Sequence, residues 1–272
     1  MSVITWGPVS IIGAGRMGRG LSLALQETGV ETTLLDRTRR PEDTLRAALV
    51  LIAVPDDAIG GLAADLAGGQ AVSERHVVLH LSGLLDRDAL RPLAGTGAAL
   101  GSFHPLQSIA DPSTARARLR GAFAGLEGDD RALHAGEGLA RALGMHPVRL
   151  APGGKAAYHA GAVIASNYVV ALGSVAEELA RKAGVPPGEA RALYLPLMQG
   201  TVDNLALGPA AALTGPVRRG DAATVRRHLA ELEPGDRALY CALGLVALRL
   251  AREAGLGALP AAAVERALTA DV

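Results

Sequence analysis

The stretch VSIIGAGRMGRG at residues 9–20 decides the expected fold of the N-terminal half. An apolar segment, Val9–Ile12, leads into a glycine-rich turn, and an amphipathic segment follows it. This is the G-x-G-x-x-G pattern in the strand–turn–helix setting that binds dinucleotides. The first glycine permits the tight turn, the second lets a pyrophosphate approach the backbone, and the third lets the helix pack on the strand. We therefore expect the phosphates of a dinucleotide to lie on Gly13, Ala14, Gly15, Arg16, Met17 and Gly18.

Composition narrows the class of protein. Of the 272 residues, 49% are hydrophobic, which is enough for a sizeable core. The 27 basic and 27 acidic residues cancel, so charge gives no reason to expect nucleic acid or an anionic membrane as a partner. The single cysteine, Cys241, excludes an internal disulfide, and the seven histidines show no helical pair with metal-ligand spacing. Without an N-terminal apolar segment or a membrane-spanning run, we expect a cytoplasmic protein that holds no metal.

The pattern of apolar segments changes near residue 153. Up to residue 150, apolar segments alternate with amphipathic ones, as in a parallel sheet covered by helices. After Pro152-Gly153-Gly154, helical spacing takes over and no clear strand follows. We therefore expect an α/β protein, with a Rossmann-type parallel sheet domain at residues 1–153 and an all-helical domain at 154–272. The strands are expected at Val9–Ile12, Thr32–Leu35, Leu49–Val54, Val77–Leu81, Ala99–Phe103, Gly121–Leu126 and Pro147–Leu150.

The end of the second expected strand bears on the choice of nicotinamide cofactor. Asp36 stands where a carboxylate usually grips the ribose hydroxyls of NAD. Arg37, Arg39 and Arg40 come directly after it and would suit the 2′-phosphate of NADP, unless they form only a solvated turn. We favour NADP and keep NAD open. Further cofactor contacts are expected from Thr38 and from later strand ends, at Val54, Pro55, Ser82, Gly83 and His104.

Lys155 is the main catalytic candidate. It is one of only two lysines among 27 basic residues, and it begins the first helix after the expected boundary. His159 and Ser166 share its helical face, and Asn167 falls to the side. Reduction of a ketone needs a proton donor near the carbonyl oxygen, and Lys155 can supply it if its pKa is lowered. His159 is the competing donor, because the pKa of an ordinary histidine lies nearer neutrality. A surface lysine and a core histidine are the structural alternatives.

Two further segments could contact a substrate. Gln107 follows His104-Pro105 at an expected strand end, where ligands of open α/β sheets bind, although a proline-stiffened turn is the simpler interpretation. Arg218 and Arg219 lie in a polar stretch between expected helices and could grip a carboxylate. Asp221 is expected to cap the next helix, so that a capped turn between helices is the alternative for this stretch.

Five segments carry a resemblance to a known superfamily. They are residues 13–18, IAVPDDAI at 52–59, GSFHPLQS at 101–108, the stretch from Tyr158 to Asn167, and LTGPVRRGD at 213–221. The chain resembles the superfamily of 6-phosphogluconate dehydrogenase, ketopantoate reductase and pyrroline-carboxylate reductase. More narrowly, it looks like bacterial Rossmann-like proteins whose C-terminal half is a helical domain of unknown function (domain of unknown function 2520 type).

The resemblance implies an NADP-linked oxidoreductase. In hydroxyacid and ketopantoate reductases a lysine on this helix is the acid and an asparagine further along orients the substrate. Lys155 and Asn167 match these residues in type, although the usual spacing is four and position 159 is here a histidine. We therefore expect an NAD(P)-dependent reductase of a small carbonyl or imine compound, with a ketopantoate-like 2-keto acid as the leading substrate. A non-catalytic NADP-binding redox sensor or scaffold is the alternative. The Ala- and Leu-rich helical domain further predicts a homodimer.

Overall fold

The computed structural model describes residues 7–36 and 46–270, and the chain divides into two compact units. The first unit runs to Tyr168 and the second begins at Val169. We expected the division near residue 153, but α5 (Lys155–Ala165) belongs to the first unit. The reason is that Lys155 and Tyr158, in the first turn of α5, form hydrogen bonds with residues at the ends of the central strands.

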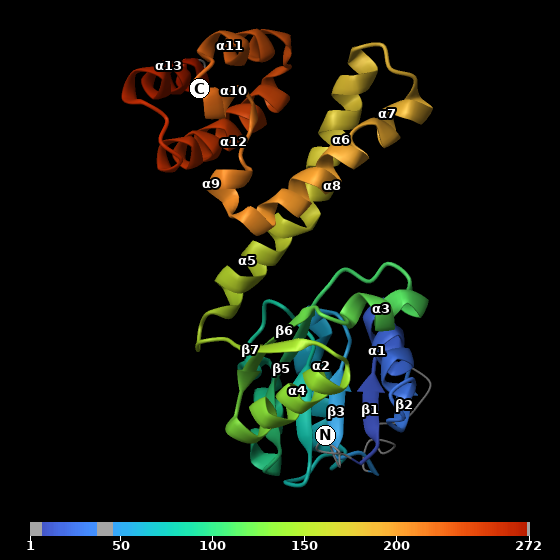
Figure 1. The fold of residues 1–272 in the computed structure, drawn as a ribbon. Coiled ribbons are helices and arrows are strands. Elements are labelled where there is room, and N and C mark those ends of the chain that lie inside the picture. Colours follow the sequence, from blue (N-terminus) through green and yellow to red (C-terminus); the bar gives the residue numbers. More distant parts are fainter. Residues whose placement is uncertain (1–6, 37–45, 271–272) are drawn as a thin grey trace. The chain divides into compact units, whose positions relative to one another are not determined.

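The N-terminal unit is built on a seven-stranded sheet in the order β2-β1-β3-β4-β5-β6-β7 (Figure 1). The expected α/β class with a Rossmann-type sheet is confirmed, because five of the six neighbouring pairs are parallel. The strands begin and end at β1 Val9–Ile12, β2 Thr32–Leu35, β3 Leu49–Ile52, β4 Val77–His80, β5 Ala99–Leu106, β6 Phe123–Gly128 and β7 His146–Arg149.

The sheet departs from the expected all-parallel arrangement at β6, which runs antiparallel to β5. A parallel pair needs a connection that carries the chain back to the other end of the sheet. Between β5 and β6 the chain forms only η3 (Pro112–Thr114) and α3 (Ala115–Leu119), and it re-enters with Phe123 opposite Leu106. A second correction is that β5 continues to Leu106, so that His104 and Pro105 are strand residues rather than a turn.

Helices cover both faces of the sheet. On one face α1 (Arg16–Gln26), α3 and α4 (Asp130–Ala142) contribute to an apolar cluster that includes Ile11, Leu25 and Phe103. On the other face α2 (Asp56–Gly68) and η2 (Arg87–Thr96) pack against Val50, Ile52 and Val78. β3 is covered by helices on both faces and is buried along its whole length, which agrees with its continuous apolar sequence.

In its described residues, the C-terminal unit consists of helices and the short connections between them. Its core is formed by apolar side chains of α10 to α13, with Leu179 of α6 packed against them. The stretch around Arg218 and Arg219 was expected to be a loop but forms the short helix α10, and Asp221 caps α11 as expected. The helices are α6 Asn167–Lys182, α7 Pro187–Leu193, α8 Leu195–Asn204, η4 Leu205–Leu207, α9 Pro209–Ala212, α10 Gly215–Arg219, α11 Ala222–Glu231, α12 Pro234–Glu253 and α13 Ala258–Thr269.

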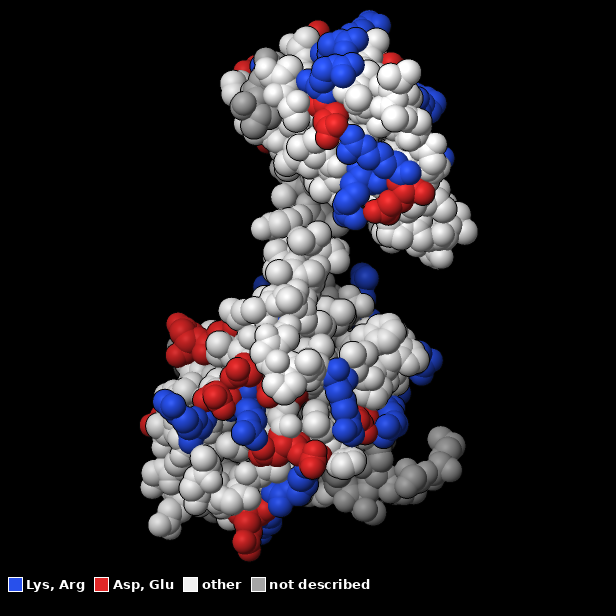
Figure 2. Space-filling view, turned by 90° about the vertical axis from the view of Figure 1, so that its left-hand side faces the viewer, with Lys and Arg blue, Asp and Glu red and all other residues white. Residues whose placement is uncertain are grey.

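The run formed by α5 and α6 is unusually apolar for an exposed segment. Lys155–Lys182 spans 28 residues with a mean hydropathy of 1.3, and by length and composition alone it could cross a membrane. This differs from the expectation that the chain has no membrane-spanning run. One helix of this kind is weak evidence for a membrane protein, and this one holds a buried, hydrogen-bonded lysine at its start. Its middle part is uncharged surface in Figure 2.

Candidate functional site

The glycine turn after β1 is shaped by its neighbours. Gly13 has a φ of +118°, and a Cβ there would stand 2.5 Å from the carbonyl oxygen of Ala53. A Cβ on Gly18 would collide with the carbonyl oxygen of Gly13. Gly15, the N-terminal cap of α1, differs because a Cβ there would meet nothing within 4 Å. Gly13 and Gly18 are therefore required by packing, whereas Gly15 leaves the backbone open to a ligand.

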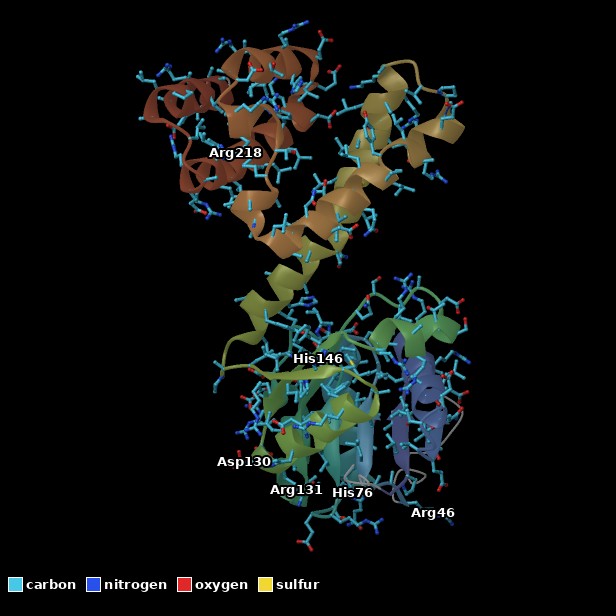
Figure 3. All side chains as sticks on the ribbon, in the orientation of Figure 1. Arg46, His76, Asp130, Arg131, His146 and Arg218 are labelled. Carbon is cyan, nitrogen blue, oxygen red and sulfur yellow. The ribbon has the colours of Figure 1, made fainter. Side chains whose placement is uncertain are left out.

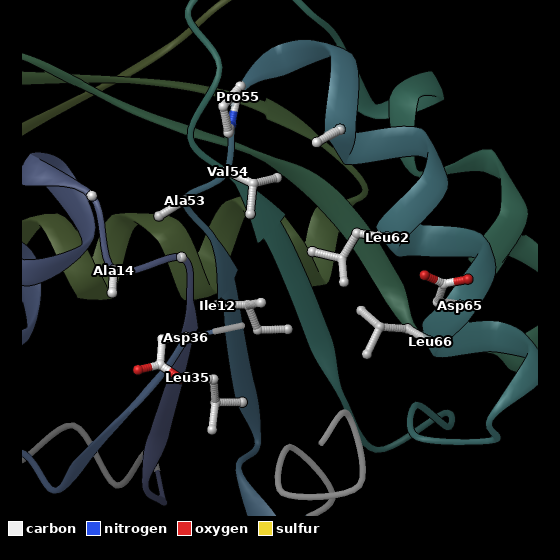
Figure 4. A pocket seen from close by; sticks show the side chains of 13 residues that line it. Ile12, Ala14, Leu35, Asp36, Ala53, Val54, Pro55, Leu62, Asp65 and Leu66 are labelled. Atoms are coloured by element: carbon white, nitrogen blue, oxygen red, sulfur yellow. The ribbon is translucent and has the colours of Figure 1, made fainter. Parts of the chain in front are cut away.

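A cavity of about 680 Å³ opens beside this turn, as Figure 4 shows. Gly13, Ala14 and Gly15 form one wall, Val54 and Pro55 another, and Asp36 lies at the end of β2. Arg16 and Met17 occupy the first turn of α1, whose free amide groups favour an anion. The residues present thus fit a dinucleotide, with bare backbone for the pyrophosphate and a carboxylate at the ribose end. Arg37 and Thr38, expected to contact the cofactor, lie outside the described residues.

Lys155 is buried against the end of β4 and the middle of β5, with 2% of its surface exposed. Its Nζ donates hydrogen bonds to the carbonyl oxygen of Ser82, at 2.6 Å, and to Oγ of Ser102, at 3.0 Å. Burial lowers the pKa of Lys155 to about 8, against the opposing effect of Glu127 and Asp56. The Ser82 hydroxyl in turn donates to Oδ2 of Asp56. A cation of lowered pKa therefore sits at the carboxyl edge of the sheet.

A second cavity, of about 540 Å³, is lined by several of the polar residues that were predicted from the sequence to contact cofactor or substrate. His159, Ser166 and Asn167 reach it from the helical run that starts at Lys155, and His104 and Gln107 reach it from β5 and the segment after it. Gly83 lies beneath the two imidazoles. A Cβ there would collide with Nδ1 of His159 and stand 2.9 Å from Nε2 of His104. His104, expected to contact the cofactor, is thus part of the polar cavity.

Tyr158 is a residue of this cavity that the sequence analysis did not select. Its hydroxyl lies 2.9 Å from Nδ1 of His104, and the two rings meet edge to face. Burial and the positive charge of Lys155 lower the pKa of His104 to about 4, so its imidazole is neutral at physiological pH. The sequence signals for Tyr158 were its place next to His159 and at the start of a segment that carries the family resemblance. Its partner in the structure lies 54 residues away in the chain.

The other polar candidates of this cavity differ in how many of their hydrogen-bonding groups already have a protein partner. The Gln107 amide donates to the carbonyl oxygen of Arg118 and accepts from the backbone of Ser108, so it holds its own segment in place. Ser166 donates to Oδ1 of Asn167 at 2.9 Å, and both side chains are exposed at the cavity. Asn167 keeps its amide hydrogens for a ligand.

Arg218 and Arg219 lie on α10 in the C-terminal unit (Figure 3 labels Arg218). The guanidinium of Arg218 donates to the carbonyl oxygen of Ala254 and so ties α10 to the end of α12. Arg219 is exposed. Their part in substrate binding stays a prediction. Within residues 7–36 and 46–270, no group of three His, Cys, Asp or Glu is arranged to hold a metal ion.

Two family models match the chain. Residues 31–105 match the Rossmann-like domain, and residues 122–247 match the domain of unknown function DUF2520. The two matches confirm the pair of domains that the resemblance indicated. No curated protein matches the sequence.

Solved structures similar to this chain cover nearly its whole length. Protein TM1727 from Thermotoga maritima is 25% identical with a TM-score of 0.71, over 90% of this chain and 98% of that one. Pyrroline carboxylate reductase from Plasmodium falciparum, with NADP bound, is 10% identical with a TM-score of 0.59, over 96% and 98%. The reductive aminase from Aspergillus terreus, in complex with NADPH4, cyclohexanone and allyl amine, is 18% identical with a TM-score of 0.56, over 95% and 91%. Because the last two structures are less than 25% identical to this chain, their similarity concerns the fold alone.

Proposed function

Because the chain joins a Rossmann-like domain to a DUF2520 domain, we propose that it is an NAD(P)-dependent reductase of a small carbonyl or imine compound. One observation carries the proposal. Nδ1 of His159 is buried over Gly83, beside the ring of His104, and has no hydrogen-bond partner among the described residues. A buried polar atom without a partner costs about 1–3 kcal/mol, and a catalytic role is one reason for a protein to retain such a cost.

NADP is the proposed cofactor, with NAD as the alternative. The Plasmodium falciparum reductase binds NADP and the Aspergillus terreus aminase binds NADPH4, and their overall fold resembles that of this chain. Asp36 lies at the cavity edge where the ribose hydroxyls would lie, and Arg37 directly follows it in sequence. A charged hydrogen bond from Arg37 to a 2′-phosphate would contribute about 1.5–3 kcal/mol.

Titration of NADPH and NADH against wild type and Arg37→Ala tests the choice of cofactor. We expect the affinity for NADPH to fall by about tenfold to a hundredfold in Arg37→Ala, with the affinity for NADH unchanged. An equal loss for both cofactors would remove the proposed contact with the 2′-phosphate.

The chemistry needs a proton donor as well as a hydride. When bound, reduced nicotinamide supplies the hydride. His159 lines the polar cavity and can pass a proton to the substrate heteroatom. Lys155 holds its positive charge beneath the same strand ends, where it favours the negative charge that develops on that heteroatom. Both residues remain candidates for the proton donor, and the exposure of His159 to the cavity favours His159.

The proposed substrate is a small molecule with a reducible C=O or C=N bond. A ketopantoate-like 2-keto acid is the first choice from the family resemblance, with Arg218 and Arg219 as candidate carboxylate contacts. An imine is the second choice, because a pyrroline carboxylate reductase and a reductive aminase share the fold. Asn167 would hydrogen-bond the substrate beside the reacting atoms.

An assay of NADPH oxidation across a panel of 2-keto acids and cyclic imines tests the reductase function, with calorimetry of NADPH binding run in parallel. We expect saturable binding together with turnover of at least one compound. Tight binding without turnover of any compound would favour the alternative, a non-catalytic NADP-binding sensor or scaffold. The unpartnered His159 nitrogen beside His104 favours the enzyme, since a scaffold has no need of it.

A homodimer is the proposed state of the protein in the cytoplasm. Ten large apolar side chains are exposed between Ile164 and Leu207. Single exposed apolar residues are normal on a protein surface, but so many in one segment indicate an interaction site. We propose that a second copy covers them. Sedimentation should show a dimer at micromolar concentration, and a monomer, or a chain that binds to neutral lipid vesicles, would contradict this. The residues are Ile164, Tyr168, Val170, Leu172, Leu193, Leu195, Leu197, Val202, Leu205 and Leu207.

A further inference from the structure

The pairing of Tyr158 with His104 joins two distant parts of the N-terminal unit. His104 lies on β5 and Tyr158 on α5, and their ring centroids are 5.5 Å apart with the planes at 90°. The Tyr158 hydroxyl and Nδ1 of His104 are 2.9 Å apart. One hydrogen lies between these two atoms. If Tyr158 donates it, Nδ1 of His104 is unprotonated and Nε2 carries the ring hydrogen, and if Nδ1 donates it, the tautomer is the reverse.

The other contact of the Tyr158 hydroxyl comes from β6. Gly125 lies opposite His104 in the β5–β6 register, and its backbone packs closely against the Tyr158 phenol. A Cβ on Gly125 would stand 2.8 Å from both Cζ and Oη of Tyr158, so the phenol needs the bare glycine to reach this place. Burial raises the pKa of Tyr158, so the phenol keeps its hydrogen, and because an imidazole nitrogen accepts a hydrogen bond better than a phenol oxygen does, donation from Tyr158 to Nδ1 of His104 is favoured.

The opposite edge of the His104 ring faces the unpartnered part of the cavity. Nε2 and Cε1 lie 2.9 Å and 3.0 Å from the place where a Cβ of Gly83 would be, next to Nδ1 of His159. Nδ1 of His104 is hydrogen-bonded to the Tyr158 hydroxyl, whereas Nε2 of His104 has no hydrogen-bond partner among the described residues. Lys155 and the neighbouring His159 both oppose a positive charge on this ring.

We propose that Tyr158 is a positioning residue that holds His104 as the Nε2–H tautomer, so that a neutral imidazole donates a hydrogen bond to the heteroatom of the reducible bond. The role of His104 rests on the proposed reductase function, whereas the tautomer itself does not. A neutral imidazole can polarise a carbonyl without giving up its proton, which separates this task from that of the proton donor. In the reverse tautomer, Nε2 would carry a lone pair and would repel the negative charge that develops on the substrate.

The chain contains a matched control for this geometry. In the C-terminal unit, Nδ1 of His228 lies 2.9 Å from the Tyr240 hydroxyl, and their rings also meet edge to face, with centroids 5.8 Å apart. Tyr240→Phe removes the same atom from the same kind of pair outside the polar cavity. Its effect on stability therefore calibrates Tyr158→Phe, and it should leave turnover unchanged.

Nitrogen NMR of the histidine rings in the full-length protein, with ¹⁵N-labelled histidine, reads the tautomer directly. His104→Gln identifies the His104 signals by their loss. In wild type we expect a protonated Nε2 and an unprotonated Nδ1 at neutral pH. In Tyr158→Phe we expect a mixture of the two tautomers at His104, and in Tyr240→Phe no change at His104. A protonated Nδ1 in wild type, or a tautomer indifferent to Tyr158→Phe, would overturn the proposal.

Kinetics test the consequence for catalysis. Because only the Nε2–H tautomer of His104 donates to the substrate, Tyr158→Phe should lower kcat in proportion to the share of that tautomer that is lost, about twofold for an equal mixture, with KM little changed. Unchanged kcat beside an altered tautomer would refute the role of His104 as a donor. If no compound is turned over by wild type, the proposed function fails and the role of His104 in reduction fails with it, whereas the tautomer measurement still decides what Tyr158 does.

Discussion

The two cavities of the N-terminal unit lie at the carboxyl edge of one sheet but are built differently. The first is formed by backbone and apolar side chains around the glycine turn, with Asp36 and Asp65 as its charged residues among those described. The second is lined by two imidazoles, a phenol, amides and hydroxyls, close to the buried ammonium of Lys155. The first cavity therefore offers a ligand mainly backbone and apolar contacts, whereas the second offers hydrogen-bond donors and acceptors.

A substitution at Gly15 tests the first cavity. Gly15→Val adds a side chain where the protein itself leaves open space, so folding should be unaffected. The added atoms would occupy the place of the pyrophosphate, and we expect the affinity for NADPH to fall about a hundredfold or more, equivalent to about 3 kcal/mol. Calorimetry measures the binding, and a thermal melt checks the fold. Gly61→Ala, in open space on α2, is the control, and equal losses in the two variants would contradict the role of the turn.

Lys155 tests the charge of the second cavity. Lys155→Met should lower kcat/KM by about 10²–10⁴ while NADPH binding is retained. Lys182→Met is the matched control, because Lys182 is the other lysine and is half exposed beside Glu233 and Asp236. In wild type, turnover should fall as the pH rises through about 8, where Lys155 loses its proton. Full turnover at pH 10 would show that the ammonium is not required.

The same residue makes a prediction about stability. Burial holds the pKa of Lys155 at about 8 when folded, against 10.5 when unfolded. Between these values the unfolded chain binds more protons, so the contribution of Lys155 to stability rises with pH. Relative to Lys155→Met, wild type should gain up to about 3 kcal/mol between pH 7.5 and pH 10.5, measured by denaturant unfolding. A difference that stays constant with pH would mean that the lysine is not buried in solution.

The smallest expected effect is at Asn167, on the rim of the second cavity. Asn167→Ala removes an amide that can contact the substrate, and we expect KM to rise about tenfold with kcat nearly unchanged, the equivalent of one hydrogen bond. Asn204→Ala, on exposed α8, controls for a general effect of losing an amide. A fall in kcat instead of a rise in KM would contradict a role of Asn167 in substrate binding and would indicate a role in the chemical step.

The first cavity could be predicted from the sequence because its signals are local. Gly13, Gly15 and Gly18 lie within six residues of one another, and Asp36 follows the next strand. The bounds of β1 and β2 agree with the expected ones for the same reason. Periodicity does not report where a connection re-enters the sheet, so the antiparallel β6 was missed.

The second cavity was predicted only in part, because it depends on distant residues. Lys155 and His159 were found from residue type and helical spacing. The roles of Tyr158 and Gly125 in this cavity were not predicted, because the contact between them joins α5 to β6 and no local sequence pattern indicates such a contact. His104 was placed in a turn because of Pro105, whereas the strand continues through both residues.

Hydrogen–deuterium exchange of the full-length protein with and without NADPH tests the central claim most directly, because it locates the cofactor without any assumption about the substrate. We predict slower exchange at the backbone amides of residues 13–18 and at the end of β3, with α11 to α13 unchanged. Exchange that is unaltered at residues 13–18 while NADPH is bound would place the cofactor elsewhere and contradict the account.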